Sequence, residues 1–181
     1  MKIIFLGAQG SGKSTQGKML AEKLGLSSID MGQILRNRAK DNDQEAEKIR
    51  SSLEKGELVE DAITIGILKA RLAEDDCLNG FVLDGYPRNE IQLKGLDSKV
   101  DVVFYIWVSD VEGIKRSMQR ARNDDKPELL AKRLELYHAR TEPLLQYFRE
   151  KGILIEIDGE RSIEEIAKDI ESKLKNVKKQ K

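Results

Sequence analysis

The sequence is poor in several residue types, and each scarcity limits what the chain can do. One cysteine, Cys77, stands among 181 residues, so neither an intramolecular disulfide nor a cysteine-based zinc site is expected. Lys plus Arg and Asp plus Glu both total 32, so net charge predicts no nucleic-acid partner. No apolar run approaches the roughly 20 residues of a membrane span, and residues 1–6 are too short for a signal peptide. We therefore expect a cytoplasmic protein without a membrane partner. We also expect a monomer, although composition does not indicate the oligomeric state.

Short apolar runs alternate with longer amphipathic stretches along the chain. Residues 3–6, 81–83, 102–108 and 153–157 are typical of buried strands, and residues 28–30 are a weaker candidate for a fifth. The strands are separated by segments long enough for crossover helices. This alternation predicts an α/β fold in three layers, in which helices cover both faces of a five-stranded parallel sheet.

Three local signals mark where helices begin or end. Ser162 and Glu165 have the spacing of a capping box ahead of the last helix, and Ser109 and Glu112 repeat that spacing after the run at 102–108. Pro143 follows a long helical pattern, and proline lacks the N–H that a helix interior needs. We expect this proline to end or bend the helix.

The first apolar run leads into a glycine-rich segment with the pattern GxxxxGK[ST], which reads GAQGSGKS at residues 7–14. Glycines let backbone N–H groups turn inward around phosphate oxygens, and the helix N-terminus that follows adds partial positive charge. Lys13 can reach the β and γ phosphates, and the Ser14 hydroxyl can join a Mg²⁺ shell. The strand before the segment and the helix after it disfavour a chance match. The motif predicts nucleoside triphosphate binding but does not name the acceptor.

A second segment, GFVLDGYPR at residues 80–88, combines an apolar strand with two charged residues. The strand delivers Asp84 to its carboxyl end, where ligands bind in open α/β sheets and where a carboxylate can hold Mg²⁺ directly or through water. Arg88 follows at once and suits a bidentate grip on a second phosphate. An ordinary turn with a surface salt bridge would explain the glycine and the proline, but not both charges.

At this point the sequence resembles a family. GAQGSGKSTQ at residues 7–16 and GFVLDGYPRNEIQ at residues 80–92 are similar to the two signature segments of adenylate kinases, and the resemblance continues over nearly the whole chain. Residues 31–36 resemble the segment that supplies an arginine for the monophosphate. Residues 55–59 resemble the loop that borders its adenine, and residues 120–125 resemble a shortened lid.

The resemblance implies a Mg²⁺-dependent kinase that catalyses ATP + AMP = 2 ADP. It implies one P-loop kinase domain at residues 1–181, with a mobile NMP-binding insert at residues 31–60 and a short lid at residues 119–128. The lid lacks cysteine, so it is expected to hold no zinc.

The resemblance also implies roles for individual residues. The expected ATP-binding residues are Gly10, Ser11, Gly12, Lys13, Ser14, Thr15, Arg116 and Arg120. The expected AMP-binding residues are Met31, Arg36, Glu57, Leu58, Val59, Gly85, Arg88, Gln92, Arg122 and Arg133. The expected catalytic residues, which act on the transferred phosphoryl group, are Lys13, Arg88, Arg120, Arg122 and Arg133. The expected Mg²⁺ residues are Ser14 and Asp84.

Several alternatives remain open from the sequence. Met31 and Gln33 replace the residues that the family usually has near the monophosphate. Asn89 follows Arg88 as it does in pyrimidine monophosphate kinases, whereas Gln92 matches the adenylate kinase pattern. A UMP/CMP kinase or a broad-specificity kinase is therefore the nearest rival. A regulatory P-loop ATPase is another, but a GTPase switch would need the guanine-reading N-K-x-D segment, which the sequence lacks. The arginines near the lid could instead line solvated helix faces.

Overall fold

The five expected strands form one parallel sheet in a computed structural model of the protein. The structure describes residues 1–96, 99–120 and 126–179, and it describes residues 178 and 179 in the backbone only. The strand order is β2-β3-β1-β4-β5. The strands span Lys2–Leu6 (β1), Ser27–Asp30 (β2), Phe81–Asp84 (β3), Val102–Trp107 (β4) and Leu154–Asp158 (β5). The predicted fold class is confirmed, and the weak candidate at residues 28–30 is the edge strand β2.

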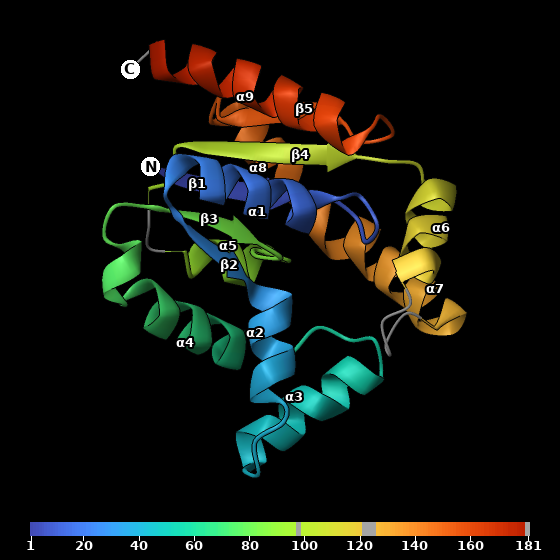
Figure 1. Ribbon diagram of the computed structural model, residues 1–181. Coiled ribbons are helices and arrows are strands. Elements are labelled where there is room, and N and C mark those ends of the chain that lie inside the picture. The colour runs from blue at the N-terminus through green and yellow to red at the C-terminus, as the bar shows by residue number, and fades with distance from the viewer. Residues whose placement is uncertain (97–98, 121–125, 180–181) are drawn as a thin grey trace.

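Helices cover both faces of the sheet (Figure 1). They span Lys13–Leu24 (α1), Met31–Arg38 (α2), Gln44–Glu54 (α3), Asp61–Leu72 (α4), Glu90–Lys94 (α5), Asp110–Arg120 (α6), Pro127–Leu136 (α7), Leu144–Glu150 (α8) and Ile163–Lys179 (α9). Two short helical segments lie at Asp75–Cys77 and Tyr137–Thr141. In the part of the chain that the structure describes, no helix has the length and apolarity needed to cross a membrane.

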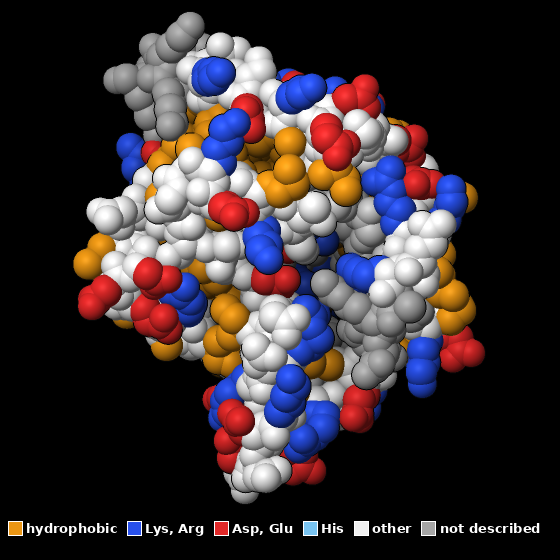
Figure 2. Space-filling view, in the orientation of Figure 1, with side chains coloured by type: hydrophobic (Ala, Val, Ile, Leu, Met, Phe, Trp, Pro, Cys, Tyr) orange, Lys and Arg blue, Asp and Glu red, His pale blue; other side chains and the backbone are white. Residues whose placement is uncertain are grey.

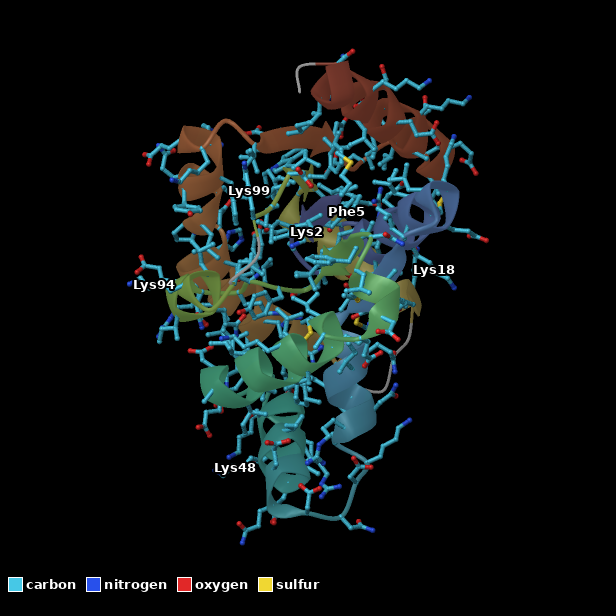
Figure 3. The ribbon with its side chains drawn as sticks, turned by 90° about the vertical axis from the view of Figure 1, so that its left-hand side faces the viewer. Lys2, Phe5, Lys18, Lys48, Lys94 and Lys99 are labelled. Atoms are coloured by element: carbon cyan, nitrogen blue, oxygen red, sulfur yellow. The ribbon has the colours of Figure 1, made fainter. Side chains whose placement is uncertain are left out.

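The central strand β1 shows why the strands read as unbroken apolar runs. Ile3 and Phe5 pack against α1 and α9, whereas Ile4 and Leu6 pack in the core that includes α4 and α8. All four side chains are buried, because each face of the sheet is covered by helices. Figure 3 labels Phe5, which lies on β1 in the middle of the sheet. The ends of these strands are therefore held rigidly, which fixes the loops that follow them.

Of the two predicted capping boxes, the one ahead of α9 is complete and the one ahead of α6 is not. At the start of α9 the Ser162 hydroxyl accepts from the Glu165 N–H at 3.3 Å, and the Glu165 carboxylate accepts from the Ser162 N–H at 3.0 Å, as a capping box requires. Ahead of α6 the reciprocal bond is missing, because the Ser109 N–H donates to Glu160 at 2.9 Å. Glu112 pairs with Arg116 at 2.7 Å instead. The expected second capping box is therefore wrong in its carboxylate half.

Pro143 interrupts the helical stretch, as predicted. The turn before it, Tyr137–Thr141, is a π-helix in which the Glu142 N–H bonds to the Tyr137 carbonyl at 2.9 Å. A π-turn widens the helix and shifts the side chains that follow it, and such turns recur at functional sites. Here the widened turn points Tyr137 and Thr141 toward the cleft described below.

The pair α2 and α3 projects from the sheet at the opposite end of the molecule from α9 (Figure 1). Figure 3 shows Lys48 on this projecting part. The pair has a small core of its own, built from Leu35, Ala39, Ile49 and Val59. Ile67 of α4 packs both against this core and against the core on one face of the sheet.

Candidate active site

The glycine loop between β1 and α1 is shaped by its packing against α6. Gly10 has φ +77°, and a Cβ atom there would lie 2.1 Å from the Gly113 carbonyl oxygen, so no side chain fits. Gly12 has φ +87° and stands immediately before the first residue of α1. The loop therefore reaches the helix N-terminus with backbone N–H groups available for an anion.

Lys13 is held across this loop. Its Nζ donates to the Ala8 carbonyl at 3.1 Å, and its side chain lines the cleft at the carboxyl end of the sheet. Burial lowers the pKa of Lys13, and the nearby Asp84 carboxylate opposes that shift. The hydroxyl of Ser11 is buried and has no hydrogen-bond partner among the described residues. The loop thus places a cation in the cleft and leaves one buried hydroxyl without a partner among the described residues.

Asp84, at the end of β3, meets Ser14 at the floor of the cleft. The Ser14 hydroxyl donates to Asp84 Oδ2, while Oδ1 is buried without a partner among the described residues. Burial raises the pKa of Asp84, and Lys13 and Ser14 act against the increase. A carboxylate oxygen beside a hydroxyl suits Mg²⁺, which prefers oxygen ligands and keeps several waters. Within the described ranges no three His, Cys, Asp or Glu side chains gather as a metal site, so phosphate oxygens and water would complete the shell.

Arg88 stands beside this pair and is fixed at three atoms. Its N–H donates to Gln92 Oε1 at 2.8 Å, its Nε donates to the Gly85 carbonyl at 3.0 Å, and its carbonyl accepts from the Thr141 hydroxyl at 2.9 Å. Burial lowers the pKa of Arg88, which Asp84 opposes. The guanidinium group therefore has a defined position next to the cation of the glycine loop.

The cleft collects further cations from distant parts of the chain. Arg36 comes from α2, Arg120 from the end of α6 and Arg133 from α7, and all three line the same cleft as Lys13 and Arg88. Figure 2 shows Lys and Arg side chains gathered where the surface is hollowed beside α2. So many cations around one cleft suit ligands that carry several negative charges.

The two sides of the cleft touch at its opening. Lys132 on α7 forms an ion pair with Glu57 at 2.8 Å, and this cation lowers the pKa of the Glu57 carboxyl. Gly56 packs against Leu129, since a Cβ at Gly56 would lie 3.3 Å from that side chain. The segment that follows α3 is therefore in contact with α7 at the edge of the cleft.

Comparison with known proteins identifies the family that shares these features. A sequence model of the family described as adenylate kinase matches residues 5–153, which is most of the chain. The chain belongs to the adenylate kinase family. It is therefore a phosphotransferase, and the resemblance inferred from the two signature segments is confirmed.

Individual adenylate kinases are similar over almost their full length. The chain is 36% identical to an adenylate kinase of Archaeoglobus fulgidus, with 98% of this chain and 100% of the relative covered. It is 39% identical to one from Bifidobacterium longum, with 92% and 96% covered. It is also 39% identical to one from Leptospira biflexa, with 93% and 97% covered. The first comparison spans 216 positions, 35 more than the 181 residues here, so that relative has segments that this adenylate kinase lacks.

The structure brings most of the predicted site residues of this adenylate kinase to one cleft. Those that line it are Lys13, Ser14, Arg36, Glu57, Leu58, Val59, Asp84, Gly85, Arg88, Gln92, Arg120 and Arg133. Gly10, Ser11 and Gly12 form the loop beside it.

Three predicted residues do not line the cleft, and a fourth lies outside the described residues. Thr15 is exposed in the first turn of α1, and Met31, the first residue of α2, is buried in the core. Arg116 is bonded to the Gly159 carbonyl at 2.7 Å and does not line the cleft. Arg122 lies outside the described residues.

Sequence reasoning missed Asp61, the first residue of α4. Its Oδ1 accepts from Asn89 Nδ2 and from Gln92 Nε2, both at 2.8 Å. An acidic residue in the first turn of a helix is common because it complements the helix dipole, so Asp61 gave no separate signal. Thr64 of the same helix also lines the cleft and was not predicted to do so.

Proposed function

We propose that this adenylate kinase transfers the γ-phosphoryl group of ATP to AMP, in a reversible reaction that yields two ADP molecules. The observation that supports it most is that Lys13 and Arg88 line one cleft together with the hydrogen-bonded Ser14–Asp84 pair. Lys13 and the glycine loop suit the donor phosphates, and Arg88 with Arg36 suits the acceptor phosphate. The family does not favour the UMP/CMP kinase or the regulatory ATPase.

The residues of the cleft supply position and charge rather than covalent chemistry. Ser14 and Asp84 would hold Mg²⁺, which would neutralise negative charge on the donor phosphates. Arg88 and Arg133 compensate the charge on the oxygens of the phosphoryl group as it passes between nucleotides. No general base is required, because a phosphate oxygen of the acceptor is already a nucleophile. For Arg88→Ala we expect a loss of roughly 10³-fold or more in kcat, on the scale of arginine fingers.

Arg120 extends this charge compensation to the lid side, and Arg122 joins it by resemblance alone. Arg116 acts from outside the cleft, where its bond to Gly159 supports the nucleotide side. The acceptor base is assigned to the pocket formed by Leu58, Val59 and Gln92.

Two segments are proposed to move during the cycle, the NMP-binding insert at residues 31–60 and the lid at residues 119–128. The small core of Leu35, Ala39, Ile49 and Val59 lies within the first segment and supports its movement as a unit. Arg120 of α6 and Arg133 of α7 line the cleft and support a lid at this place. We expect a bisubstrate analogue to protect both segments from hydrogen exchange. Equal exchange with and without the analogue would contradict closure.

A coupled assay with ATP and Mg²⁺ tests the proposal by comparing AMP, CMP, UMP and GMP as acceptors. We expect AMP to give the highest kcat/KM, and a higher value for CMP or UMP would assign a pyrimidine kinase instead. Lys13→Met serves as the control, and undiminished transfer in that variant would refute the assigned donor site. Gel filtration tests the proposed monomer, and the cytoplasm, where these nucleotides are held, is the proposed location.

A further inference from the structure

Asp61 joins two amide side chains beside the cleft. It is half-buried, and its Oδ1 accepts one N–H from Gln92 Nε2 and one from Asn89 Nδ2, each at 2.8 Å. Gln92 is 1% exposed and lines the cleft. Asp61 does not line it, so it acts on a ligand only through the residues it holds.

Backbone groups independently fix which end of each amide faces Asp61. The Gln92 N–H donates to Asn89 Oδ1 at 2.9 Å, and the Arg88 N–H donates to Gln92 Oε1 at 2.8 Å. A backbone N–H can only donate, so each amide turns its oxygen toward the backbone and its NH₂ group toward Asp61. An ionised carboxylate only accepts, so Asp61 completes the arrangement and disfavours the flipped amide.

The fixed orientation gives Gln92 a directional preference. In the described ranges one N–H of Nε2 and one lone pair of Oε1 have no hydrogen-bond partner, so both remain for a ligand. The edge of adenine offers a 6-amino donor beside the N1 acceptor, which pairs with an amide oxygen and an amide N–H. Hypoxanthine offers a 6-oxo acceptor beside an N1–H donor, the reverse order. An amide locked in one orientation can match one of these edges without turning, but not both.

We propose that Asp61 is a positioning residue that locks the Gln92 amide and thereby selects an acceptor base with a 6-amino group over one with a 6-oxo group. This inference rests on the proposed function, in which the acceptor base lies against Gln92. The selection works through unmade hydrogen bonds, because a polar group that must turn or stay unpaired on binding weakens the wrong complex.

The test compares AMP and IMP as acceptors, since these two monophosphates differ only at the base edge in question. For Asp61→Ala we expect the AMP/IMP ratio of kcat/KM to fall about tenfold, the lower end for a lost hydrogen bond to a charged group. The KM for ATP is expected to stay unchanged. Asp61→Asn is expected to retain most of the ratio, because its amide oxygen can accept the same two N–H groups.

Controls separate positioning from a general structural effect. Glu164→Ala removes an exposed acidic residue from the first turn of α9, away from the cleft, and is expected to leave the ratio unchanged. In a Gln92→Ala background, Asp61→Ala is expected to cause no further change, because Asp61 acts through Gln92. If Asp61→Ala does not fold, Asp61→Ser offers a polar first-turn residue with a shorter reach.

Two outcomes would overturn the inference. If Asp61→Ala lowered kcat/KM equally for AMP and IMP, Asp61 would be a structural residue only. If Asp61→Ala lowered the AMP/IMP ratio further in the Gln92→Ala background, Asp61 would act through a residue other than Gln92. The wild-type profile is measured in the same assay. A wild type without transfer to AMP would refute the proposed function as well, whereas an AMP-preferring wild type with an unchanged variant ratio would refute the role of Asp61 alone.

Discussion

The hydroxyl of Thr141 ties the π-helix to the backbone of Arg88, and Thr141→Val tests what that bond contributes. Thr141 is 8% exposed, and its hydroxyl donates to the Arg88 carbonyl at 2.9 Å. Valine has a similar shape but no donor, so the carbonyl loses this partner. Leaving a buried polar group unpaired costs about 1–3 kcal/mol of unfolding free energy. For a chain of this size that corresponds to a decrease in Tm of roughly 2–4 °C per kcal/mol.

The same variant is expected to affect binding on one side only. Arg88 would keep its bonds to Gln92 and Gly85 but lose the one that holds its carbonyl. Its guanidinium group would then be positioned less well for the acceptor phosphate, so we expect a higher KM for AMP and an unchanged KM for ATP.

Calorimetry and steady-state kinetics together check this prediction, with Thr141→Ser as the matched variant. Serine keeps the hydroxyl and loses only a methyl group, so it is expected to restore the KM for AMP. A Thr141→Val enzyme with wild-type Tm and wild-type KM for AMP would refute the reasoning, because the bond from the π-helix would then support neither the fold nor the position of Arg88.

Three further predictions concern other parts of the molecule. Asp84→Asn removes the buried negative charge beside Ser14. A Mg²⁺ titration of activity is expected to show a half-saturating Mg²⁺ concentration about 10–100-fold higher than in wild type. The Glu142 carboxylate, assisted by Asp110, raises the pKa of His138, so the stability gained from the charged ring is complete below pH about 6.5 and is lost as the pH rises through the folded pKa. The Tm advantage of wild type over His138→Gln is therefore expected to be larger in acid than above pH about 8. Gly113→Ala would place a Cβ 2.8 Å from the Gln9 carbonyl oxygen in the glycine loop, so urea titration is expected to show a loss of about 1–3 kcal/mol of unfolding free energy. The matched variant Gly66→Ala on α4 has open space around the new Cβ and is expected to gain about 0.5–1 kcal/mol.

Features encoded by neighbouring residues could be predicted from the sequence. The strands were recognisable because both faces of the sheet are covered, so Ile3, Ile4, Phe5 and Leu6 are all apolar. The glycine loop was recognisable because its backbone geometry, the cation and the hydroxyl all lie within eight residues. Signals of this kind depend on local chemistry, which a single sequence displays directly.

Features that depend on long-range pairing could not be predicted in the same way. The capping-box spacing predicted that the Ser109 N–H would bond to Glu112. It bonds instead to the carboxylate of Glu160, 51 residues away. Asp61 is 31 residues from Gln92, and nothing near either residue indicates the partner. Thr141 meets Arg88, 53 residues away, through a π-turn that no local pattern in the sequence marks.

An ion pair in contact with solvent makes the entrance of this enzyme sensitive to dissolved salt. Lys132 and Glu57 are each more than 40% exposed, so mobile ions compete for both charges, and at physiological ionic strength their attraction fades beyond about 8 Å. Added KCl is therefore expected to favour the separated arrangement and to raise the KM for AMP. Lys132→Met is expected to remove that part of the salt dependence, so the ionic composition of the surrounding solution helps to set how readily the acceptor is retained.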